Sequence, residues 1–85
     1  MEPALILVEH RTEPRRRVLK AAVIGFGGAG ITCTVRNISN AGALLEVESP
    51  LGVPDRFTLH IESEQSKRAC RVVRRQEKRI DVAFE

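Results

Sequence analysis

The sequence predicts an all-β fold, namely a six-stranded antiparallel β-barrel preceded by a flexible N-terminal arm. Three observations lead to this prediction. The chain has 85 residues, which is enough for one domain with one hydrophobic core. From residue 17 onward, apolar and polar side chains alternate with a period near two, not the 3.6 of a helix. The alternating segments are short and regularly spaced, with polar turns between them, as in small antiparallel barrels.

The first strand is expected at residues 17–26, a long and largely apolar segment, and the second at residues 31–36, which are rich in β-branched side chains. The glycine-rich residues 27–30 between them are expected to form a hairpin turn that needs positive φ angles. Residues 25–30 also match the GxGxxG pattern of dinucleotide-binding folds. That function requires a helix directly after the glycines, whereas Ile-Thr-Cys-Thr-Val favours a strand, so we reject it here.

The other four strands are expected at residues 43–48, 56–61, 68–75 and 80–84. Each has apolar side chains at alternate positions and mostly polar ones between them, which is the pattern of a strand with one buried face. Polar loops and turns separate these segments, and Pro and Gly mark the turn at residues 50–54. Closing the six strands into a barrel removes the exposed sheet edges that would otherwise promote aggregation.

The chain divides into an N-terminal arm, residues 1–16, and the barrel, residues 17–85. The only early apolar run, Ala4–Val8, lies between two glutamates and is too short for the core of a signal peptide. No segment approaches the roughly 18 apolar residues of a membrane-spanning helix. We therefore expect no membrane span and a cytoplasmic location.

The two cysteines, Cys33 and Cys70, lie in predicted strands and lack the CxxC spacing of a metal site. Only two histidines accompany them, so no metal-ligand set can be assembled. No nucleophile–base pair or carboxylate dyad is evident either. We expect buried thiols, no metal, no cofactor and no enzymatic activity.

The formal net charge of +3 is divided into two basic blocks. Residues 11–20 carry five basic groups and residues 67–79 carry seven, with one glutamate in each block. The two blocks either meet on one face and attract an anion, or lie on separate solvated faces, and charge alone leaves both arrangements open. Three Phe and no Trp or Tyr leave few platforms for stacking bases, which disfavours a nucleic-acid partner.

Two short motifs stand out at the start and in the middle of the chain. Arg11 and Arg15 form an RxxxR pattern, and Asn37, Ser39 and Gly42 form an NxSxxG pattern in a loop between two predicted strands. Each pattern alone is common. Together they resemble the PilZ domain family, in which RxxxR precedes a six-stranded barrel and NxSxxG follows within it. The resemblance covers roughly residues 10–85.

The resemblance implies that the chain binds cyclic di-GMP, a bacterial second messenger, through Arg11, Arg15, Asn37, Ser39 and Gly42. Arg16 joins these ligand-binding candidates because it would take a clamp position if the register of the arm were shifted. The residue types suit the ligand. A guanidinium presents a planar fork of donors to phosphate oxygens or to a guanine edge, and Asn and Ser supply short polar contacts.

The function expected from the sequence is therefore a regulatory domain that binds cyclic di-GMP, changes its N-terminal arm on binding and acts on a downstream protein partner. Two alternatives remain. One is a PilZ-like adaptor that does not bind nucleotide, and the other is a small basic barrel that binds nucleic acid.

Overall fold

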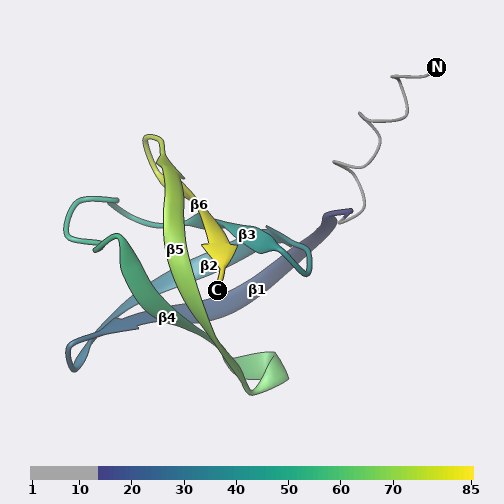
Figure 1. The fold of residues 1–85 in the computed structure, drawn as a ribbon, viewed down its shortest axis with the longest axis horizontal. Helices are drawn as coiled ribbons and strands as arrows, with labels where there is room; N and C mark the ends of the chain where they lie inside the picture. The colour runs from purple at the N-terminus through teal and green to yellow at the C-terminus, as the bar shows by residue number, and fades with distance from the viewer. Residues whose placement is uncertain (1–13) are drawn as a thin grey trace.

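A computed structural model of the chain describes residues 14–85, which form a closed six-stranded barrel (Figure 1). The strands are β1 (Arg16–Phe26), β2 (Ala29–Ile38), β3 (Gly42–Glu46), β4 (Arg56–Ile61), β5 (Ser66–Arg75) and β6 (Arg79–Phe84), with a short 3₁₀ helix, η2 (Glu62–Glu64), between β4 and β5. Their order around the barrel is β1-β2-β3-β6-β5-β4, and every neighbouring pair is antiparallel. The predicted all-β class and six-stranded barrel are confirmed.

The strand boundaries differ slightly from those expected. β1 begins at Arg16, one residue earlier than predicted, and β2 extends through Ile38 into the segment that the sequence indicated to be a loop. The remainder of the predicted arm, residues 1–13, lies outside the described residues. Within residues 14–85, no helix is long and apolar enough to cross a membrane.

The interior of the barrel is aliphatic. Alternate residues of each strand point inward, and five of the larger ones are completely buried: Ile24, Leu45, Leu59, Ile61 and Ile80. Cys33 and Cys70 are buried among them as free thiols, as predicted. Burial raises the pKa of both thiols to about 11, so they remain protonated at neutral pH.

The β1–β2 hairpin turns at Gly27 and Gly28, whose φ angles are +52° and +82°. Two consecutive positive φ angles are those of the tight turn that matches the twist of a hairpin, and glycine adopts them without steric cost. The expected turn is confirmed, but it is shorter than predicted, because Gly30 already pairs with Gly25 in the ladder. A strand, not a helix, follows the glycines, which rules out the dinucleotide-binding arrangement here.

Three irregularities interrupt the ladders. Between β1 and β2, Val18 and Leu19 stand opposite Arg36 alone; between β2 and β3, Arg36 is an extra residue of β2, and between β5 and β6, Val73 is an extra residue of β5. Such bulges rotate a strand locally and redirect its side chains, and they are frequent beside functional sites. Leu19 and Val73 are 70% and 60% exposed, although simple alternation gives no reason for exposed apolar side chains there.

Candidate ligand-binding site

One row of side chains crosses five strands on the outer surface of the barrel. In the ladders, each member of this outer row stands opposite the next: Arg17, Asn37, Leu44, Asp81 and Arg74. Residues that face each other across a ladder point to the same side of the sheet. None of the five is buried, and the three bulges each adjoin the row.

Arg15 lies just before β1 and contacts the middle of the outer row. Its Nη1 donates a hydrogen bond to Oδ1 of Asn37 at 2.6 Å and lies 4.0 Å from Oδ1 of Asp81. The fold thus joins the second arginine of RxxxR to the first residue of NxSxxG, which are 22 positions apart in the sequence. The contacts are solvent-exposed, so each contributes little stability and a ligand can replace them at small cost.

Ser39, by contrast, is directed into its own loop. It is buried, and its hydroxyl accepts hydrogen bonds from the amides of Ala41 at 3.1 Å and Gly42 at 3.3 Å. The amide of Ser39 donates to the carbonyl of Gly42 at 2.9 Å, which closes the loop. The serine predicted as a ligand contact therefore holds the shape of the loop that follows Asn37.

Gly42 begins β3 and lies against β6. A Cβ atom at this position would overlap the carbonyl oxygen of Val82 and would lie 3.2 Å from the Cα of Ala83. Close approach of two strands therefore requires glycine here. The sequence marks Gly42 as a candidate ligand-binding residue, and the structure adds a separate reason for glycine at this position, namely the backbone of β6.

The tip of the loop is fixed from the other side by the end of the chain. The amide of Phe84 donates to the carbonyl of Ala41 at 2.8 Å. Arg68 donates to the carbonyl of Asn40 at 3.5 Å, and its guanidinium lies 4.0 Å from the centre of the Phe84 ring. A cation above an aromatic ring is attracted to it, so Arg68 ties β5 to both the loop and β6.

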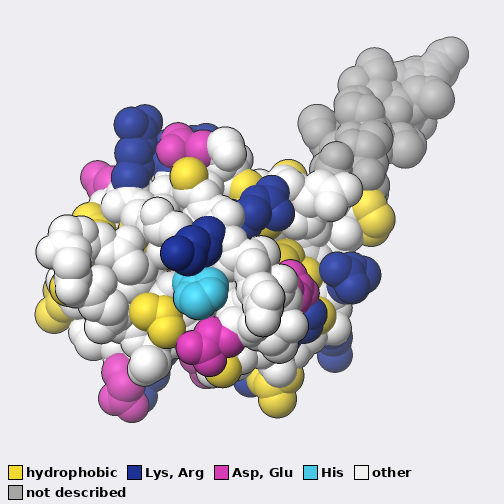
Figure 2. All heavy atoms as spheres, turned by 90° about the horizontal axis from the view of Figure 1, so that it is seen from below, with side chains coloured by type: hydrophobic (Ala, Val, Ile, Leu, Met, Phe, Trp, Pro, Cys, Tyr) yellow, Lys and Arg dark blue, Asp and Glu magenta, His cyan; other side chains and the backbone are white. Residues whose placement is uncertain are grey.

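The arginines of the second basic block, residues 67–79, have different roles. Arg75 donates to Oδ1 of Asp55 at 2.8 Å and to the carbonyl of Val53 at 2.8 Å, and Arg71 lies 3.6 Å from Glu85. These arginines fasten loops and the chain end to the barrel. Arg79, in contrast, lines an outer hollow together with Arg17. Basic and acidic side chains are interspersed on the face shown in Figure 2. The two basic blocks therefore meet through Arg17 and Arg79, whereas Arg71 and Arg75 form ion pairs with other parts of the chain.

A hollow of about 300 Å³ lies on the outer surface beside Asn37. Its lining is Arg17, Val18, Arg36, Asn37, Leu44 and Arg79. The volume is at the lower end of the roughly 300–1,000 Å³ of small-molecule sites. Guanidinium groups around an apolar surface suit a ligand that combines phosphate with a flat base.

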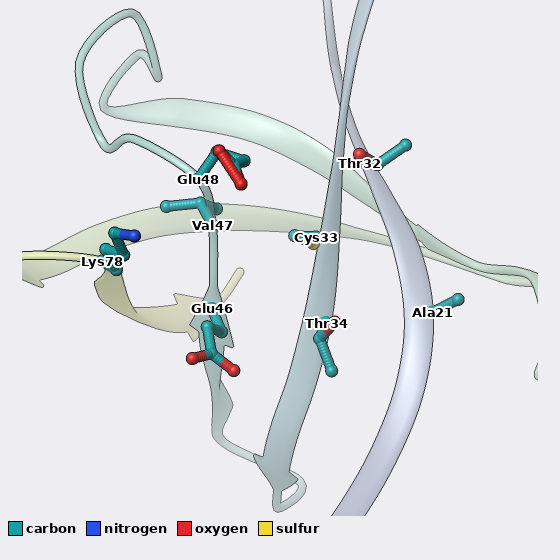
Figure 3. A pocket seen from close by; sticks show the side chains of 8 residues that line it. All are labelled: Ala21, Thr32, Cys33, Thr34, Glu46, Val47, Glu48 and Lys78. Carbon is teal, nitrogen blue, oxygen red and sulfur yellow. The ribbon is translucent and has the colours of Figure 1, made fainter.

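A second hollow of about 480 Å³ lies where β2 separates from the segment after β3 (Figure 3). Cys33 lies on the side of β2 that faces Val47, and Glu46 and Glu48 come from the opposite wall. The raised pKa of Cys33 keeps its thiol neutral, and the carboxylates of Glu46 and Glu48 outnumber the one cation of the lining, Lys78, so they repel a phosphate. This hollow therefore fits an anionic ligand poorly.

Two predicted candidates remain to be placed. Arg16 pairs with Ile38, whose side chain is buried, so it lies on the opposite side of β1 from Arg17 and is exposed. Arg11 lies outside the described residues. Among residues 14–85, no three His, Cys, Asp or Glu side chains cluster closely enough to hold a metal ion.

The sequence does not indicate Leu44, Asp81 or Arg79 as site residues. Alternation placed Leu44 and Asp81 on the outer face of their strands, but it carries no register between strands distant in sequence. Their proximity to Asn37 appears only when β3 pairs with both β2 and β6.

The family model described as the PilZ domain matches residues 9–85, nearly the whole chain. No curated protein matches the sequence.

Proposed function

The chain belongs to the PilZ domain family, a family of cyclic di-GMP-binding effector domains, and on that premise we propose that it binds cyclic di-GMP on the outer row beside Arg15 and Asn37. It acts as a regulatory domain without catalytic activity of its own, in the cytoplasm of a bacterium. Ligand binding changes the N-terminal arm and thereby the surface offered to a downstream protein.

The hydrogen bond between Arg15 and Asn37 is the observation that carries this proposal. It brings both family motifs to one exposed place, next to a hollow with an arginine-rich lining. The Arg15 fork pairs with a phosphate or with O6 and N7 of guanine, and Asn37 offers both a donor and an acceptor to a base edge. Ser39 and Gly42 contribute by fixing the loop that holds Asn37 in place.

Arg11 is proposed as the second clamp arginine, with Arg16 as its substitute in a shifted register. Ordering of the arm by the ligand is testable by hydrogen exchange of residues 9–16. We expect slower exchange with cyclic di-GMP than without it, and equal protection in the two states would contradict a switch in the arm.

Calorimetric titration of the full chain with cyclic di-GMP tests the binding itself. We expect saturable binding that weakens at least tenfold in Arg15→Gln, because charge-assisted hydrogen bonds to the ligand contribute roughly 1.5–3 kcal/mol each. Lys67→Gln removes the same charge from an exposed position on β5 and is the matched control.

Two outcomes would favour the alternatives. Absence of saturation by cyclic di-GMP together with salt-sensitive binding of single-stranded DNA would support a nucleic-acid binder. Absence of both would support an adaptor without a nucleotide ligand. Equal affinities of Arg15→Gln and wild type would remove Arg15 from the site.

A further inference from the structure

We propose that the hollow lined by Arg17, Arg36 and Arg79, here called the arginine hollow, is a second anchoring point that binds a phosphodiester group of the same ligand. The inference rests on the proposed function and extends it to three residues that neither family motif includes. The arginines come from β1, β2 and β6, which β3 joins into one continuous stretch of sheet.

The register of the strands explains why the three arginines converge. Arg17 stands opposite Asn37 in the β1–β2 ladder, and Arg79 stands opposite Glu46 in the β3–β6 ladder. Arg36 is the extra residue of the β2 bulge and lies directly before Asn37. The bulge thus adds a guanidinium at a position that a regular ladder would not contain.

The charge around the hollow favours an anion. Arg36 lies 3.3 Å from Glu46 and is partly neutralised by it. Among residues 14–85, no carboxylate lies within ion-pair distance of Arg17 or Arg79. Three guanidinium groups against one carboxylate leave two positive charges at one end of the outer row.

Apolar contacts complete the site. Val18 and Leu44 also line the hollow, and each is half-buried, so a base or sugar can cover apolar surface while the arginines contact phosphate. A volume of about 300 Å³ holds only part of a cyclic dinucleotide. The remainder of the ligand extends past Asn37.

The position of Asn37 connects the two anchoring points. Its side chain accepts the hydrogen bond from Arg15, and the same residue lines the arginine hollow. Cationic groups on both sides of one asparagine match a ligand with two phosphates better than a ligand with one. We therefore assign one phosphate of cyclic di-GMP to Arg15 and the other to the arginine hollow.

Titration of full-length variants with cyclic di-GMP tests this assignment. We expect Arg79→Gln and Arg17→Gln each to raise the Kd about tenfold, and Arg36→Gln to raise it less, because Glu46 already partly neutralises Arg36 in the wild type. Lys78→Gln is the matched control, since it removes the same charge at the adjacent position. A thermal melt of each variant establishes that it is folded. Because Arg17→Gln and Arg79→Gln are tested separately, the test does not depend on the folding of one variant.

The outcomes separate this inference from the proposed function. If wild type binds and both Arg17→Gln and Arg79→Gln match Lys78→Gln, the arginine hollow is not an anchoring point, although the proposed function stands. If wild type does not bind cyclic di-GMP, both are overturned. A parallel titration uses GMP. We expect Arg79→Gln to weaken GMP binding by a smaller factor than it weakens cyclic di-GMP binding, because GMP has one phosphate and occupies one anchoring point. Equal losses would contradict the assignment of two phosphates to two points.

Discussion

Asn37 and Ser39 lie two positions apart in one motif, but they occupy very different surroundings. Asn37 lies on the outer row, where its side chain contacts the exposed Arg15. Ser39 is buried, and within the described part of the chain its hydroxyl bonds only to the backbone of its own loop. These two motif residues therefore have different roles, since Asn37 is available to a ligand and Ser39 holds the loop that follows Asn37.

On this geometry, we expect that the motif does not consist of ligand contacts alone. Substitutions at the exposed end should change binding and leave stability intact, whereas substitutions at the buried end should lower stability first. Three substitutions test this division, and each has a control of the same chemical type.

The largest effect is expected at Gly42. Gly42→Ala places a Cβ against the carbonyl of Val82, and because strand backbones cannot move apart cheaply, we expect a loss of about 3 kcal/mol or more in the free energy of unfolding. Gly25→Ala is the control, because its Cβ would lie 3.7 Å from the carbonyl oxygen of Thr58, an ordinary contact. Urea unfolding of both variants measures the effect, and equal stabilities would refute the role of close approach at Gly42.

A smaller loss is expected at Ser39. Ser39→Ala removes the acceptor for two loop amides, which should cost about 1–2 kcal/mol of stability. Cyclic di-GMP affinity should fall less than in Arg15→Gln. Ser63→Ala, an exposed serine of η2, is the control. A variant with unchanged stability and no binding would show instead that the Ser39 hydroxyl contacts the ligand.

The smallest effect is expected at Asp81, and it has the opposite sign. Asp81→Asn removes a carboxylate 4.0 Å from Arg15 and thereby a competitor for the ligand phosphate. We expect the affinity for cyclic di-GMP to rise about two- to threefold, since an exposed ion pair contributes less than about 1 kcal/mol. Glu62→Gln neutralises an exposed carboxylate in η2 and should leave the affinity unchanged. Weaker binding in Asp81→Asn would mean that the carboxylate positions Arg15 for the ligand.

Much of the fold could be predicted from the sequence, because a strand with one buried face has apolar side chains at every second position. The same pattern failed at Leu19, Arg36 and Val73, since a bulge inserts a residue without changing the composition around it. Local patterns also located Asn37 and the loop after it. They could not place Asp81 or Arg79 beside that loop, because ladder register is set by packing between distant strands.

The roles of Arg68 and Gly42 also depend on contacts that appear in the fold and not in the sequence. Arg68 reads in the sequence as one more charge in a basic block, but it lies over the ring of Phe84 and contacts the Asn40 carbonyl. The motif marks Gly42 as a ligand-binding candidate, but the backbone of β6 requires glycine there. In both cases the decisive neighbour is far away in the chain.

The buried thiols of Cys33 and Cys70 offer a built-in reporter of barrel opening. With a pKa near 11 and almost no exposed surface, neither should react with a maleimide until the barrel opens. Labelling rates then follow the opening equilibrium without any attached dye. A ligand that binds only the closed barrel slows labelling in proportion to the fraction of protein that it occupies. One reagent can therefore measure both the stability and the nucleotide affinity of every variant above.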